Sequence, residues 1–306
     1  MWNQLRLLVQ ERYNERGIFV AEKEWENRVA YLGPEGTFTH LATKRLFEND
    51  WLIPVKTIPE CIEAVSEGQV DLAVVPIENA LEGIVPLTID YLYHEANLFV
   101  AAEMAIPIAQ HLMVNKAQLE NWENVEHIYS HSHALAQCHK YLYYRFRTVP
   151  QNAQSSTAAA AKYVSERPEE CIAAIANEAA AARYDLAIVE SNIHDFHFNH
   201  TRFFVLSKSN IRVESLTHDE QVKTTLMVKL PNDNPGALHQ LLSVFSWRRL
   251  NLSKIESRPL KTKLGEYFFI VDVLEDERVP MMQGAMEELR ALGCSVKSLG
   301  SYYMFE

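Results

Sequence analysis

The chain has 306 residues, 48% of them hydrophobic and 23% charged, with a formal net charge of −11 at pH 7. This length accommodates two domains, and the composition is that of an ordinary globular protein. The negative charge disfavours nucleic acid as a partner, because phosphate backbones are bound by basic surfaces. An anionic small molecule would need local donors, such as helix N-termini or an arginine.

The cysteines and the hydropathy pattern indicate a reducing, cytoplasmic location. No run approaches the roughly 18 apolar residues of a membrane span, so no membrane contact is expected. Residues 1–27 are charged throughout, lack the apolar core of a signal peptide and are interpreted as an N-terminal extension. The cysteines are far apart and form no C-x-x-C pair, so we expect free thiols at Cys61, Cys138, Cys171 and Cys294.

From Val29 to residue 208, short apolar runs alternate with segments of helical period. The apolar runs predict strands over 29–32, 70–77, 97–106, 127–130, 171–176 and 203–208. The segments between them predict helices over 40–47, 61–68, 133–144 and 156–166. This alternation predicts an α/β architecture with largely parallel sheets. Two clusters of such units, before and after residue 107, predict two lobes with a cleft between them.

After residue 208 the rhythm changes. Residues 209–222 are polar and predict a linker. A compact module follows, with strands predicted over 223–230, 250–260, 265–274 and 294–303 and helices over 234–249 and 280–293. The order β-α-β-β-α-β is the ferredoxin-like arrangement.

Three histidines at three-residue spacing suggest a metal site, but geometry disfavours it. On a helix this spacing turns each imidazole a further ~60° around the axis. On a strand, His197 would face away from His194 and His200. No H-E-x-x-H or C-x-x-C pattern lies nearby. We therefore expect solvated loop histidines and no metal.

Hydroxyls and glycines recur where a predicted strand turns into a helix. They occur at Gly36-Thr37, at Ser130 and Ser132, and at Ser155-Ser156-Thr157. Free N–H groups at helix starts attract carboxylates, and open α/β sheets bind ligands at the carboxyl ends of strands. For any single junction, helix capping alone is the favoured explanation. Several junctions facing one cleft would form a site for a small carboxylic acid.

Glu78 and Asn79 follow a buried strand and would emerge at the carboxyl end of the sheet. The asparagine amide offers both a donor and an acceptor, while the glutamate could orient it or move a proton. The alternative is a capping pair before the helix that is expected to start near Val85.

Five motifs occur in the order found in prephenate dehydratases, and the chain resembles that family over residues 28–303. They are VAYLGPEGTFTHLAT, VVPIENALEGIVPLTIDYL, SHSHALAQC, AQSSTAAAA and NHTRFFVL. The tail, with NPGALHQLLSVF and LNLSKIESRPL, resembles the ACT regulatory domain of those enzymes. The resemblance implies that residues 28–208 form a catalytic domain of two α/β lobes like periplasmic binding proteins, and that residues 223–303 form an ACT domain.

The resemblance also implies a reaction, the conversion of prephenate to phenylpyruvate, CO2 and water on the route to phenylalanine. Aromatisation of the ring drives this step, so no cofactor is implied. The family's essential catalytic residue matches Thr201, which we expect to hydrogen-bond or protonate the departing hydroxyl. Glu78, Asn79 and Gln137 are the other expected catalytic residues. The expected substrate-binding residues are Gly36, Thr37, Ser156, Thr157, Arg202 and Phe203.

Thr201 and Arg202 cannot both face the cleft from a regular strand, because adjacent side chains point to opposite faces. Arg202 therefore either pairs with a substrate carboxylate or forms a structural ion pair, and the sequence leaves both open. Ser132, His133 and Ile84 depart from the usual family motifs, so no role is carried over to these positions.

The ACT-like region implies feedback control by L-phenylalanine bound where two such domains pair, and hence a homodimer or homotetramer. A helix start at residues 234–239 suits a ligand carboxylate, and Pro259 favours a strand end or edge. Most apolar residues at helical spacing there are expected to be core, which is compatible with a site at the helix start. The expected effector residues are Asn234, Gly236, Ala237, Leu238, His239, Glu256, Ser257, Arg258 and Pro259.

Two other functions fit the same motifs. Arogenate dehydratase shares the scaffold and acts on the amino-acid form of the substrate. A non-catalytic aromatic-acid sensor would join two ligand-binding lobes to an ACT domain. The combination of Thr201, Glu78, Asn79 and Gln137 argues against a sensor, which would not need the complete set.

Overall fold

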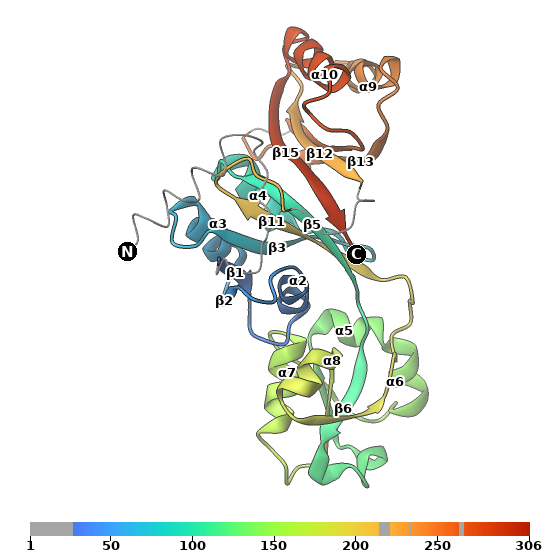
Figure 1. The fold of residues 1–306 in the computed structure, drawn as a ribbon. Coiled ribbons are helices and arrows are strands. Elements are labelled where there is room, and N and C mark those ends of the chain that lie inside the picture. Colours follow the sequence, from blue (N-terminus) through green and yellow to red (C-terminus); the bar gives the residue numbers. More distant parts are fainter. Residues whose placement is uncertain (1–26, 214–220, 233, 263–265) are drawn as a thin grey trace, which may run out of the picture.

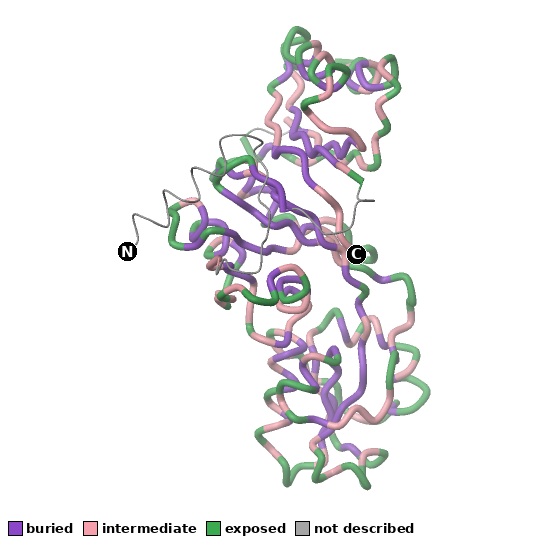
Figure 2. Tube along the Cα trace, viewed as in Figure 1, coloured by how far each residue is buried: buried purple, intermediate pink, exposed green. Residues whose placement is uncertain are grey.

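The computed structural model describes residues 27–213, 221–232, 234–262 and 266–306. Most of the expected N-terminal extension and part of the expected linker lie outside these residues. The described chain forms three parts in a row, with a first lobe in the middle, a second lobe at one end and a C-terminal module at the other (Figure 1). Buried residues follow the strands of each part (Figure 2).

The first lobe is built on six strands of a ten-stranded mixed sheet, with helices on both faces. Its strands, in sheet order, are β5 (Phe99–Pro107), β11 (His200–Ser207), β3 (Leu72–Asn79), β1 (Arg28–Leu32) and β2 (Trp51–Val55), with β4 (Gly83–Ile84) paired to β3. Its helices are α2 (Phe38–Leu46), α3 (Ile58–Ser66) and α4 (Pro86–His94). Phe204 packs in the core that includes residues of α3 and α4, whereas Phe203 packs in the core beside α2. Successive side chains of β11 therefore serve opposite faces of the sheet.

The second lobe is built on a five-stranded sheet. Its strand order is β10 (Leu186–Glu190), β6 (His111–Asn115), β9 (Ile172–Ala176), β7 (His127–Ser130) and β8 (Gln151–Ala153). Its helices are α5 (Ser132–Gln137), α6 (His139–Arg145), α7 (Thr157–Ser165) and α8 (Glu178–Arg183), with 3-10 turns η1 (Lys116–Gln118) and η2 (Trp122–Asn124). Alanines of α7, α8 and β9 share one buried cluster, because small side chains let these elements approach closely. The single helix predicted over 133–144 is divided into two at Cys138.

The C-terminal module confirms the predicted β-α-β-β-α-β order. Its elements are β12 (Val222–Lys229), α9 (Ala237–Trp247), β13 (Leu252–Pro259), β14 (Tyr267–Val273), α10 (Pro280–Ala291) and β15 (Ser295–Phe305). Within the sheet the strands follow the order β13-β14-β12-β15. The two helices pack on the sheet through a core that includes Leu226, Phe245, Val271 and Leu289.

The module shares its sheet with the first lobe. β15 pairs in parallel with β5 through Tyr303, Met304 and Phe305, which lie opposite Ala102, Glu103 and Met104. One ten-stranded sheet therefore extends from β13 to β2. The sequence predicted a last strand ending at residue 303 and a module set apart by a linker. The final residues of β15 instead form the joint between the two parts.

The prediction of largely parallel sheets is wrong for the strands that connect the lobes. β11 pairs antiparallel with β3 and β5, and β6 pairs antiparallel with β9 and β10. Because β5 leads the chain out of the first lobe and β11 brings it back, these neighbours run in opposite directions. Parallel pairing holds among β1, β2 and β3 and among β7, β8 and β9. In the described ranges, no helix has the length and apolarity needed to cross a membrane.

Candidate active site at the ends of β3 and β11

Thr201 and Asn79 face each other across the β3–β11 pair. The antiparallel register places Thr201 opposite Asn79, and Asn79 Nδ2 donates a hydrogen bond of 2.9 Å to Thr201 Oγ1. A hydroxyl oxygen that accepts a hydrogen bond becomes a better donor through its own hydrogen, because the bonds polarise one another. This hydrogen bond would strengthen Thr201 as a donor, as its expected catalytic role requires.

The Asn79 amide is held in one orientation by its neighbours. Its Nδ2 group also donates to Asn199 Oδ1 at 2.9 Å, and its Oδ1 accepts from the backbone N–H groups of Leu81 and Glu82 at 3.0 and 3.2 Å. Asn199 is only 2% exposed. Sequence reasoning missed Asn199, although it stands two residues before Thr201 in the NHTRF motif.

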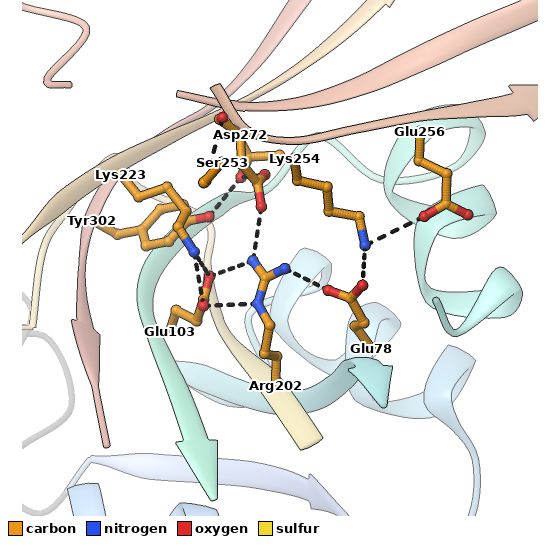
Figure 3. A network of polar contacts seen from close by, with 10 residues as sticks. Glu78, Glu103, Arg202, Lys223, Ser253, Lys254, Glu256, Asp272 and Tyr302 are labelled. Carbon is orange, nitrogen blue, oxygen red and sulfur yellow. Dashed lines mark hydrogen bonds and ion pairs between the residues drawn. The ribbon is translucent and has the colours of Figure 1, made fainter. Parts of the chain in front are cut away.

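Glu78 and Arg202 occupy the opposite face of the same strand pair, as side-chain alternation requires. Arg202 Nη1 donates to Glu78 Oε2 at 2.5 Å, and Arg202 Nε and Nη2 donate to the two oxygens of Glu103 at 2.8 and 2.7 Å. Arg202 Nη2 also donates to Asp272 Oδ2 at 2.8 Å (Figure 3). Of the two roles that the sequence left open for Arg202, this geometry favours the structural ion pair.

The ion pairs keep these groups charged. Burial acts to raise the pKa of Glu78, but the hydrogen bond from Lys254 and the charge of Arg202 outweigh burial and lower it. The pKa of Glu103 is lowered in the same way, against burial, by Arg202 and Lys223. Burial acts to lower the pKa of Arg202, but Glu103 and Asp272 outweigh it and raise that pKa. Glu78 is thus held as a carboxylate and is poorly suited to donate a proton.

Gln137 reaches the first lobe through Glu82. Gln137 Nε2, at the end of α5, donates to Glu82 Oε1 at 3.2 Å, and His133 Nδ1 lies 2.5 Å from Glu82 Oε2. Glu82 lies three residues beyond Asn79, in the turn that joins β3 to β4. These contacts bring α5 of the second lobe close to the end of β3. His133, to which the family pattern assigned no role, is one of the contacts between lobes.

The Gly36-Thr37 turn also lies where the two lobes meet. The Gly36 carbonyl accepts from Asn177 Nδ2 at 2.9 Å, and its N–H donates to His40 Nδ1 at 3.1 Å. Thr37 Oγ1 caps α2 by accepting from the His40 N–H at 3.2 Å. The turn therefore has a capping role, and its predicted contact with substrate stays a prediction.

The remaining predicted substrate contacts have structural roles here. Ser156 Oγ caps α7 by accepting from the Ala159 N–H at 3.0 Å, and Thr157 is buried at the first position of that helix. Phe203 is 1% exposed and belongs to the core of the first lobe, so this geometry gives no support to a substrate contact by its ring.

The three histidines do not converge on one point. His194 Nδ1 accepts from the Gln110 N–H at 3.3 Å, and His200 Nδ1 shares a hydrogen bond of 3.2 Å with the Phe198 carbonyl. His194 and His197 have ring centroids 5.4 Å apart, in an edge-to-face arrangement. Within the described part of the chain, no three His, Cys, Asp or Glu residues gather as metal ligands.

The predicted effector residues lie at a helix start and on an edge strand of the module. Gly236 is the N-cap of α9 and has a φ of 87°, a left-handed conformation that favours glycine. Ala237 N–H donates to the Asn234 carbonyl at 3.0 Å, and Leu238 and His239 follow in the helix. Glu256, Ser257, Arg258 and Pro259 form the end of β13, at the edge of the ten-stranded sheet.

Comparison with known proteins supports the family resemblance. The prephenate dehydratase family model matches residues 29–211. The prephenate dehydratase of Bacillus subtilis (strain 168) is 53% identical over 283 residues, which cover 91% of this chain and 99% of that protein.

Two solved structures of known proteins have similar folds. The prephenate dehydratase of Arthrobacter aurescens in complex with L-Phe has a TM-score of 0.78 and 33% identity, covering 90% of this chain and 89% of that one. GqqA, described as a novel type of quorum quenching acylase, has a TM-score of 0.77 and 28% identity, covering 90% of this chain and 98% of its own. The matched family model and the close relative together establish that the chain belongs to the prephenate dehydratase family.

Proposed function

We propose that this chain catalyses the decarboxylating dehydration of prephenate to phenylpyruvate in L-phenylalanine biosynthesis. The observation that carries the proposal is the hydrogen bond from Asn79 Nδ2 to Thr201 Oγ1 in a member of this family. The reaction requires a hydrogen-bond donor at the hydroxyl group that leaves the ring, and this hydrogen bond would make Thr201 a stronger donor.

The reaction breaks two bonds and makes the ring aromatic. The electrons of the bond to the ring carboxylate form a new ring double bond as CO2 leaves, the adjacent ring double bond shifts toward C4, and the C4–O bond breaks with its electrons leaving on the oxygen. The leaving oxygen takes up one proton and departs as water. Thr201 would donate its hydroxyl hydrogen to this oxygen, while Asn79 supports the charge that develops on Oγ1.

The other expected residues divide into two groups. Gln137, at the contact between the lobes, would bind a substrate carboxylate through its side-chain amide. The starts of α2 and α7 would bind carboxylates through the N–H groups of their first turns. Glu78 is assigned no proton transfer, because its pKa is lowered. Arg202 is assigned no substrate contact, because its donors are occupied by protein carboxylates.

Regulation by L-phenylalanine is part of the proposal. It is supported by the solved relative described in complex with L-Phe and by the β-α-β-β-α-β module, which we propose to be an ACT domain. Residues 234–239 and 256–259 would bind the effector where two modules pair, in a cytoplasmic homodimer or homotetramer.

The direct test is incubation of the full chain with prephenate and, separately, with arogenate, each with and without L-phenylalanine. We expect phenylpyruvate from prephenate, less of it when L-phenylalanine is added, and little turnover of arogenate. Preferential turnover of arogenate would assign the chain to the arogenate dehydratases instead. Binding of either compound without turnover would identify a sensor and contradict the enzymatic proposal.

A further inference from the structure

A network of charged side chains crosses the boundary between the first lobe and the C-terminal module (Figure 3). The first lobe contributes Glu78 from β3, Glu103 from β5 and Arg202 from β11, and the module contributes Lys223 from β12, Lys254 from β13 and Asp272 from β14. All six side chains are at most 24% exposed. The network therefore lies inside the shared sheet region and not on the surface.

Of these six side chains, the first lobe supplies two carboxylates and one guanidinium, whereas the module supplies two ammonium groups and one carboxylate. Arg202 pairs with Glu78 and Glu103 inside the first lobe, and Lys254 pairs with Glu256 inside the module. The contacts across the boundary add Lys254 to Glu78, Lys223 to Glu103 and Asp272 to Arg202. Because a buried charge without enough partners is costly, the module completes the pairing of the charged residues next to Thr201 and Asn79.

Lys254 contacts a residue beside one proposed site and a residue of the other. Its Nζ lies 2.5 Å from Glu78 Oε1 and 3.3 Å from Glu256 Oε2, and its side chain is 15% exposed. Glu256 belongs to the proposed effector segment. Glu78 directly precedes Asn79, whose amide donates to Thr201 Oγ1. One side chain of the module therefore contacts the residue beside the proposed donor pair and a residue of the proposed effector site.

We propose that Lys254 is a positioning residue for the dehydratase reaction and couples the module to Thr201. This inference rests on the proposed function. The Lys254 ammonium holds Glu78, and with it the end of β3, where Asn79 meets Thr201. When the effector binds, movement of Glu256 changes the contacts of the Lys254 ammonium group. The altered position of Lys254 then shifts Glu78, and with it the neighbouring Asn79.

The test compares Lys254→Met with Arg248→Met in the full chain. Arg248 forms a comparable ion pair with Glu288, at 2.5 Å, that joins α9 and α10 within the module and makes no contact with the first lobe in the described residues. We expect Lys254→Met to lower kcat about tenfold with KM for prephenate changed by less than about threefold, because the Thr201 donor acts mainly in the transition state.

The same variant tests the coupling. We expect the L-phenylalanine concentration that halves activity to rise about tenfold in Lys254→Met, while calorimetry still detects L-phenylalanine binding. Lys254→Arg retains the charge and should restore kcat to within about threefold of the wild-type value. Arg248→Met should match the wild type in kcat and in inhibition.

The proposal is overturned if Lys254→Met and Arg248→Met give the same kcat and the same inhibition. Should Lys254→Met not fold, hydrogen exchange of the wild-type chain decides the question. Added L-phenylalanine should change the exchange of backbone amides at residues 78–82, and unchanged exchange there would contradict the coupling. Failure of the proposed function appears separately, as absence of phenylpyruvate formation by the wild-type enzyme.

Discussion

Thr201 depends on the amide beside it for its proposed role as a donor. A threonine hydroxyl is a weak acid in water, so some neighbour must polarise it. Asn79 does so with one N–H, and its second N–H is held by Asn199. The sequence indicated both Thr201 and Asn79. Only the register of the β3–β11 pair shows that these two residues, 122 positions apart, are in contact.

Removal of the Thr201 hydroxyl should affect catalysis more than binding. We expect Thr201→Val to lower kcat about 10²–10³-fold with a small change in KM, as when one transition-state donor is lost. Thr201→Ser keeps the hydroxyl and should retain most activity. Steady-state kinetics of phenylpyruvate formation provide the measurement.

A suitable control is Thr43→Val, because Thr43 is a buried threonine whose Oγ1 donates only within α2, to the Thr39 carbonyl at 2.7 Å. It should leave kcat close to the wild-type value. Equal activity of Thr201→Val and Thr43→Val would show that Thr201 is not the donor.

At the scale of elements, local patterns predicted the type of most helices and strands but not their partners. The apolar runs over β1, β3, β5, β7, β9 and β11 were recognised, because buried strands have a clear hydrophobic signature. The sequence did not predict β2, β4, β6, β8 and β10. β2 is a short edge strand with a proline at position 54, and β4 and β8 have only two and three residues. The opposite faces of β11 explain why Thr201 and Arg202 have different neighbours.

The turn between β1 and α2 yields a prediction at this scale. Gly36 has a φ of 86°, and a Cβ added there would lie 3.3 Å from the Cα of Ala180 in α8 of the second lobe. Gly68, after α3, has a φ of 76° and no atom within 4 Å of such a Cβ. We expect each glycine-to-alanine variant to lose about 1–2 kcal/mol of unfolding free energy from backbone strain.

Only Gly36→Ala should also raise KM or lower kcat, because it alone pushes the lobes apart. Chemical denaturation measures the loss of unfolding free energy in both variants, and steady-state kinetics measure KM and kcat. Equal kinetics of Gly36→Ala and Gly68→Ala would contradict a role for this turn in the spacing of the lobes.

At the scale of the whole molecule, the charged network makes the joined sheet sensitive to acid. Glu78 and Glu103 have pKa values below the ordinary 4.5, because their cationic partners outweigh burial. A carboxylate with a lowered folded-state pKa stabilises the fold above its unfolded pKa, and this contribution is lost as the pH falls through the folded pKa. The unfolding free energy should therefore decrease below pH 4.5.

Glu103→Gln tests this dependence. At pH 7 it should lower the unfolding free energy by about 3–5 kcal/mol, since Arg202 and Lys223 each lose a buried partner. The difference from wild type should shrink in acid, where the wild-type carboxylate becomes protonated. Chemical denaturation over a pH series measures the difference in unfolding free energy between wild type and variant. A difference that stays constant down to acid pH would show that the Glu103 charge is not the cause of the acid sensitivity.

The exposed pair of Glu123 and Arg145, with side chains 69% and 48% exposed, provides the control. Glu123→Gln should change stability by less than about 0.5 kcal/mol at neutral pH, because solvent screens surface ion pairs.

The sequence by itself determined the two-lobed α/β pattern and the β-α-β-β-α-β module, because hydrophobic periodicity is a local property. Thr201 was indicated by the resemblance of its motif to a known family. Tertiary structure decided which groups surround that threonine. The partners of Arg202 come from residues 99 and 70 positions away, and Lys254 meets Glu78 across 176 positions. These partners meet only in the folded sheet, and Lys254 meets Glu78 only because the module is joined to the first lobe through β15 and β5, so no local pattern could show their pairing.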